Sequence, residues 1–156
     1  MIQRIQTIYL LLSATASALM FVIPFGQIVS INHDVPGSKI DLSTIVSLGT
    51  EYPILLGVPI LILVALLISI IAIFIYKKRV LQIKVCKVNL LIYLVVIFVI
   101  FFYDNQGVLN AMNMNESKII YEFGSFLPIM ATIFTFLASR SIKKDDDLIR
   151  SADRIR

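Results

Sequence analysis

The sequence has few of the residues that enzymes use for redox, haem or metal chemistry. Its 156 residues include one cysteine, Cys86, one histidine, His33, and no tryptophan. A single cysteine forms neither an intrachain disulfide nor a redox dithiol, and a single histidine does not supply paired haem ligands. His33, Asp34 and Asp41 match no established metal-ligand spacing. We therefore expect a protein that is not an enzyme, with no catalytic, cofactor-binding or metal-binding residues and no cofactor.

Charged residues are also scarce. They make up 15% of the chain, whereas hydrophobic residues make up 58%, and soluble domains are about a quarter charged. This composition indicates a polytopic membrane protein. The net charge of +4 does not point to nucleic acid, because such binding needs a basic face on a soluble fold, and here the basic residues flank apolar runs. We expect no nucleic-acid partner.

Four long stretches contain no charged residue. The clearest runs from Tyr52 to Tyr76 and ends against Lys77, Lys78 and Arg79. At about 1.5 Å per residue, a helix of this length crosses a hydrocarbon core of about 30 Å. The predicted fold class is therefore an all-α membrane protein, a four-transmembrane-helix bundle in a single domain, 1–156. We expect its spans at about 7–28, 53–76, 86–103 and 122–140.

The distribution of basic residues predicts the orientation. Of the 14 Lys and Arg residues, only Lys39 and Lys118 lie in the two segments that we expect outside the cell, 29–52 and 104–121. The others lie beside the first span, in or beside the loop 77–85, and in or beside the tail 141–156. Short basic loops resist translocation, so this asymmetry predicts that both termini are cytoplasmic.

The first external loop contains a strong turn signal. Asp34, Pro36 and Gly37 fall between two flanks that contain apolar residues, about 27–32 and 39–46. Turn residues between such flanks favour a short β-hairpin on the outer surface.

Small residues recur at close spacing in the first and last spans, whereas the second and third spans are bulky and β-branched. Small side chains let two helix backbones approach closely, so we expect the first and fourth helices to pack together. The predicted helix-packing residues are Ser13, Ser17, Ala14, Ala18, Gly124, Ala131 and Ala138.

Three prolines, Pro24, Pro59 and Pro128, fall in the outer halves of their expected spans. A missing amide hydrogen bond loosens or kinks a helix, so the prolines predict an outer pocket for a lipid or small ligand. The alternative is that the prolines reflect only the ordinary geometry of helix ends and form no pocket.

The two ends of the chain resemble a known family. The first ten residues read MIQRIQTIYL, and the last thirteen read KDDDLIRSADRIR. With the four-span layout between them, these ends are similar to the small membrane proteins of Bacteroidetes grouped as domain-of-unknown-function family 4293. The resemblance implies an inner-membrane location in a Gram-negative cell. It implies no established activity and supplies no catalytic residues.

Polar residues concentrate at these two ends, where two helices would meet. Such residues are costly to bury unless they are paired, and we interpret them as a cytoplasmic docking surface, with Arg4 near the carboxylates of the tail. The alternative is that they only end two helices and orient the protein. The candidate surface comprises Gln3, Arg4, Gln6, Asp145, Asp146, Arg150, Asp153 and Arg154.

These features favour a structural or accessory subunit of an envelope complex. A lipid- or small-ligand-binding bundle is one alternative. An oligomeric channel or transporter component is another, although the four runs contain none of the ionisable residues that usually line an ion path. The expected partners are membrane lipids, with other membrane or envelope proteins as a further class.

Overall fold

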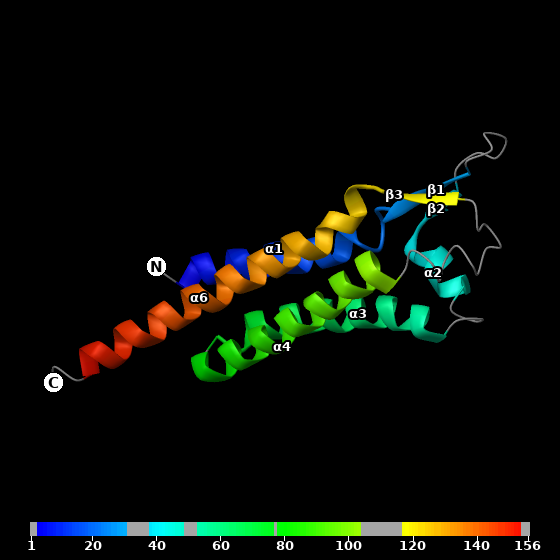
Figure 1. Ribbon diagram of the computed structural model, residues 1–156. Coiled ribbons are helices and arrows are strands. Elements are labelled where there is room, and N and C mark those ends of the chain that lie inside the picture. Colours follow the sequence, from blue (N-terminus) through cyan, green and yellow to red (C-terminus); the bar gives the residue numbers. More distant parts are fainter. Residues whose placement is uncertain (1–2, 31–37, 49–52, 77, 104–116, 154–156) are drawn as a thin grey trace.

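The computed structural model describes residues 3–30, 38–48, 53–76, 78–103 and 117–153, and it is mostly helical. Four long helices form an antiparallel bundle (Figure 1). Helices α1 and α4 each pack mainly against α3 and α6, so the four helices form a ring. Their bounds are α1 (Gln3–Leu19), α3 (Pro53–Phe74), α4 (Arg79–Phe98) and α6 (Leu127–Asp153).

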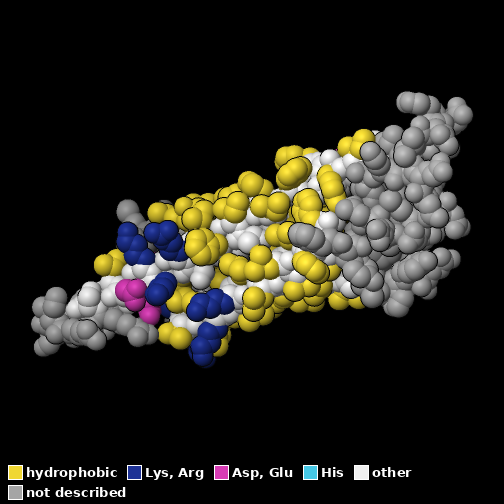
Figure 2. Space-filling view, viewed as in Figure 1, with side chains coloured by type: hydrophobic (Ala, Val, Ile, Leu, Met, Phe, Trp, Pro, Cys, Tyr) yellow, Lys and Arg dark blue, Asp and Glu magenta, His cyan; other side chains and the backbone are white. Residues whose placement is uncertain are grey.

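The helix lengths are compatible with a membrane protein. Among the described residues, Leu56–Phe74, Arg79–Phe101 and Phe123–Ile149 are three helical segments long and apolar enough to cross a membrane. The apolar part of α1, Ile5–Leu19, is shorter. The surface of the bundle is also apolar: Leu91 is 62% exposed and Ile60 is 58% exposed. Figure 2 shows hydrophobic side chains covering the middle of the bundle, as expected for contact with lipid.

Helix α1 ends well before the expected end of the first span, residue 28. Its last residue is Leu19, and turns follow until strand β1 (Gly26–Ser30) begins. Pro24 explains part of the difference, because proline lacks an amide hydrogen and disfavours helical geometry in the residue before it. The Phe25 amide then donates to the Ile40 carbonyl at 2.9 Å. A strand therefore replaces the last turns of the expected helix.

A three-stranded antiparallel sheet lies at one end of the bundle, which we call the sheet end (Figure 1). Strand β1 is central. It pairs with β2 (Ser38–Ile40) on one edge and with β3 (Ser117–Tyr121) on the other. The sheet thus joins the two segments that we expected to be separate external loops. Strand β3 falls within the segment 104–121, for which we expected no strand, and the predicted turn at 34–38 lies largely outside the described residues.

The second flank of the expected hairpin, 39–46, is mostly not a strand. Strand β2 ends at Ile40, and helix α2 (Leu42–Leu48) follows. Leu42 and Ile45 are both buried, and a spacing of three residues places them on one helical face, whereas in a strand they would point to opposite faces. The helical arrangement therefore lets both side chains join Ile40 and Phe25 in the core at the sheet end.

Two short helices complete the described chain. The π-helix η1 (Val99–Tyr103) continues α4, and the 3-10 helix η2 (Phe123–Phe126) precedes α6. The rings of Phe101 and Tyr121 lie 5.1 Å apart between centroids. This contact holds η1, at the end of α4, against β3.

Candidate functional site

A layer of buried polar side chains crosses the middle of the bundle. Each of its six members is no more than 1% exposed, and each of the four long helices contributes at least one. They are Ser13 and Ser17 of α1, Ser69 of α3, Asn89 and Tyr93 of α4, and Thr135 of α6. We call this set the polar layer.

Tyr93 lies at the centre of the polar layer. Its hydroxyl is 2.5 Å from the Ser17 hydroxyl and 3.3 Å from those of Ser13 and Ser69. The Ser13 hydroxyl lies 2.7 Å from that of Thr135, and the Asn89 amide donates to Ser69 Oγ at 2.8 Å. The network joins all four helices without an ionisable carboxylate, lysine or histidine, so it is suited to holding the helices in register.

Of these six residues, Ser13 and Ser17 are among the helix-packing residues predicted from the sequence. A usable signal was present, because Ser13 and Ser17, and likewise Asn89 and Tyr93, are four residues apart. Polar residues at that spacing in an otherwise apolar helix share one face. Exposing that face to lipid costs free energy, so the spacing predicts that the face is buried in the bundle.

The opposite end of the bundle is basic. It comprises the start of α1, the α3–α4 turn, the start of α4 and the part of α6 from Arg140 onward, and we call it the basic end. Figure 2 shows Lys and Arg side chains gathered there, beside a small acidic patch. Within it, the side-chain amide of Gln6 donates to Asp145 Oδ2. Gln6 and Asp145 are 6% and 7% exposed, respectively, so this contact fastens α1 to α6 rather than facing solvent.

Gln82 closes the α3–α4 turn. Its amide nitrogen donates to the Ala72 carbonyl at 2.9 Å, and that carbonyl is one of the last four of α3, which have no partner within the helix. The side-chain oxygen, Gln82 Oε1, is buried and has no hydrogen-bond partner among the described residues, and the same holds for Asn89 Oδ1 in the polar layer.

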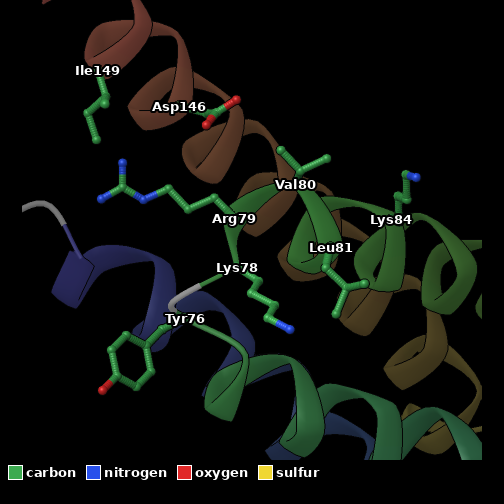
Figure 3. Close-up of a pocket in the computed structure, with 8 residues that line it drawn as sticks. All are labelled: Tyr76, Lys78, Arg79, Val80, Leu81, Lys84, Asp146 and Ile149. Atoms are coloured by element: carbon green, nitrogen blue, oxygen red, sulfur yellow. The ribbon is translucent and has the colours of Figure 1, made fainter. Parts of the chain in front are cut away.

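The described residues of the basic end line three cavities. The largest, of about 820 Å³, lies between the α3–α4 turn and α6. Figure 3 shows that the Arg79 side chain extends into it between Ile149 and Tyr76, with Asp146 above on α6. The second, of about 640 Å³, is lined by Gln6 and Leu11 of α1 together with residues of α3 and α4.

The third cavity, of about 510 Å³, is a groove between α4 and α6, which we call the α4–α6 groove. Its cationic residues are Lys84 and Lys87 of α4 and Arg140 and Lys143 of α6. These four groups make it the most densely cationic of the three cavities. Such a groove can hold an anionic group.

The predicted docking residues fall into two groups in the structure. Gln6 and Asp145 contact each other and are buried, whereas Asp146 is half-buried and lines two of the cavities. The side chains of Gln3, Arg4, Arg150 and Asp153, and all of Arg154, lie outside the described part of the structure. The expected proximity of Arg4 to the tail therefore remains a prediction.

The predicted packing residues are distributed unevenly. Ser13, Ser17, Ala131 and Ala138 are buried in the bundle, whereas Ala14 is half-buried and Ala18 is exposed. Helix α1 therefore turns its serine pair, rather than its alanine pair, toward the interior of the bundle, where Ser13 meets α6 and Ser17 meets Tyr93 of α4. The Ser13 hydroxyl lies 3.4 Å from the Ala131 carbonyl.

Gly124 packs closely against the backbone of Ile23 and Pro24, which follow α1. A Cβ atom at this position would lie 2.1 Å from the Pro24 carbonyl oxygen. A distance this short is far inside van der Waals contact, so only glycine allows η2 to meet the chain that follows α1.

The three prolines occupy different positions. Pro24 follows α1 and is half-buried, Pro59 is buried inside α3, and Pro128 is buried at the second position of α6. That last position suits proline, since its amide would have no helical partner. None of the three prolines lines the cavities at the basic end, and the outer pocket remains a prediction.

Comparison with known proteins adds one match. No curated protein and no solved structure matches the chain. The family model described as Domain of unknown function (DUF4293) matches residues 2–155. This match confirms the resemblance drawn from the two ends of the sequence, and the chain belongs to the DUF4293 family.

Proposed function

We propose that this protein is an inner-membrane accessory subunit, without catalytic activity, that docks a protein partner on its basic end. In this proposal all four long helices cross the membrane, and both termini and the basic end face the cytoplasm. The apolar surface of the bundle and the concentration of Lys and Arg at one end support this orientation.

The observation that carries the docking proposal is the projection of α6. Helix α6 continues to Asp153 and extends beyond the other helices at the basic end (Figure 1). On this projection Leu148 is 51% exposed and Ile149 is 43% exposed. They follow directly after Asp146 and Asp147, so apolar and acidic groups are adjacent on a helix that extends from the bundle.

Such a surface fits a protein partner better than lipid alone. Acidic groups are repelled by an anionic membrane surface, whereas a partner helix with apolar and basic residues would complement both components. The buried contact between Gln6 and Asp145 fixes the base of the projection against α1. The partner would therefore meet a preorganised surface.

The test is affinity purification of the tagged protein at native expression level in a mild detergent, followed by mass spectrometry of what elutes. We expect a stoichiometric protein partner that is lost in the double variant Leu148→Ser/Ile149→Ser while the abundance of the bundle stays at the wild-type level. Val46→Ser is the matched control, because Val46 is 44% exposed at the sheet end. A bundle that elutes without a stoichiometric partner, or a partner that the double variant retains, would contradict the proposal.

A further inference from the structure

We infer that the α4–α6 groove is a binding site for the headgroup of an anionic phospholipid. This inference goes beyond the docking proposal, because it concerns the groove between α4 and α6 rather than the projecting end of α6, and a ligand from the membrane itself. It rests on the charges, the shape and the position of the groove.

The charges of the groove are arranged as a clamp. Lys84 and Lys87 are three residues apart on α4, and Arg140 and Lys143 are three residues apart on α6. At this spacing both members of each pair lie on one face of their helix. The groove is therefore flanked by two cations on each side, an arrangement that complements a phosphate group.

The groove also has an apolar part. Ile83 of α4 and Phe136 of α6 contribute to its lining. Phe136 lies one helical turn before Arg140, toward the middle of the bundle, and is 53% exposed. A phospholipid matches this order, because its charged headgroup lies at the membrane surface and its chains extend into the hydrocarbon region. A free phosphate ion would use only the charged part.

Two carboxylates limit the affinity of the groove. Asp146 and Asp147 line its end toward the α6 projection, where they would repel the phosphate. They would also limit how far the headgroup moves toward the projection, and this places it beside Arg140 and Lys143. Removal of one carboxylate should strengthen binding, an effect that a misfolded variant would not produce.

The experiment is native mass spectrometry of the purified full-length protein, titrated with phosphatidylglycerol or with phosphatidylcholine of the same chain composition. We expect retention of phosphatidylglycerol in preference to phosphatidylcholine. The double variant Arg140→Gln/Lys143→Gln should weaken phosphatidylglycerol binding by at least about tenfold, since each cation near an anionic lipid contributes roughly a fivefold factor. Asp147→Asn should strengthen phosphatidylglycerol binding by a few-fold, which is about the effect expected from removing one negative charge beside the phosphate.

The matched control is Lys78→Gln/Lys144→Gln, which removes the same charge from exposed positions at the same end that do not line the groove. We expect this control to bind phosphatidylglycerol within about twofold of wild type, because neither cation contacts the site. Equal losses in the two double variants would show only a general basic surface and would overturn the inference. It would also be overturned by equal retention of phosphatidylcholine, or by displacement of the lipid by millimolar inorganic phosphate, since the site would then recognise free phosphate.

Discussion

Tyr93 of α4 is the residue at which hydrogen bonds from α1 and α3 meet. Its hydroxyl lies within 3.3 Å of Ser13, Ser17 and Ser69, and the ring is fully buried. Buried hydroxyl groups that lose a partner cost free energy because no water replaces it. The polar layer therefore makes one arrangement of the helices more favourable than rotated ones.

We predict that Tyr93→Phe lowers the free energy of unfolding by about 1–2 kcal/mol, because it leaves the serine hydroxyls without their shared partner. Thermal unfolding of the purified protein in detergent measures the change. Tyr9→Phe is the matched control, since Tyr9 is half-buried and outside the polar layer. A Tyr93→Phe protein as stable as the control would argue against a stabilising role for the layer.

Gly124 sets a second constraint at the scale of one residue. We predict that Gly124→Ala destabilises the protein by about 1–3 kcal/mol, because the new Cβ meets a backbone carbonyl that cannot turn aside as a side chain would. The clash is with the Pro24 carbonyl oxygen. In the same unfolding measurement Gly57→Ala should be neutral or stabilising, because a Cβ at Gly57 meets nothing within 4 Å in helix α3 and alanine favours a helix. Equal effects of the two substitutions would contradict the prediction.

At the scale of elements, the pairing of α1 with α6 depends on contacts in the middle of the bundle and at the basic end. The Ser13 and Thr135 hydroxyls meet in the polar layer, and Gln6 meets Asp145 at the basic end. Asp145 is nearly inaccessible to water, and the Gln6 amide gives its carboxylate a compensating hydrogen bond.

We predict that Gln6→Leu lowers the free energy of unfolding by about 2–3 kcal/mol, because it removes a hydrogen-bond donor from a buried carboxylate. The combination Gln6→Leu/Asp145→Leu should recover part of this loss, since no charge then remains buried at the contact. A double-mutant cycle from unfolding curves measures the coupling between the two residues. Additive losses would show that the two side chains do not stabilise each other.

The sequence predicts some of these elements and misses others for physical reasons. Helix α3 (Pro53–Phe74) coincides with an uncharged run, because length and apolarity are local properties. The positions of β1 and β3 depend on partners distant in sequence: Gly26 of β1 pairs with Ile40 and with Tyr121. Neither pairing leaves a local signal as strong as a hydrophobic run.

The candidate site shows the same division. Basic residues beside spans are visible in the sequence, so Lys84 and Lys87 stand out at once. Their meeting with Arg140 and Lys143 in one groove requires α4 and α6 to be neighbours. Small residues in the first and last spans predict that these two helices are neighbours, but no pattern in the sequence places the third span beside the fourth.

At the scale of the whole molecule, we propose that the four-helix bundle spans the membrane with its basic end in the cytoplasm. Helix α1 is the helix for which a membrane span most needs testing, because its 17 residues are at the lower limit for a span. If α1 did not cross, Thr7 at its start and Ser47 of α2 would lie on the same side.

The most direct test is cysteine labelling in a Cys86→Ala background with a maleimide that does not cross the inner membrane. Single cysteines would replace Thr7, Ser47, Lys78 and Ser151, all exposed in the structure. In spheroplasts we predict labelling of the Ser47 position alone, and labelling of the other three only after permeabilisation. Labelling of Thr7 together with Ser47 in intact spheroplasts would remove α1 as a span, and labelling of Lys78 or Ser151 from outside would contradict the proposed orientation of the basic end.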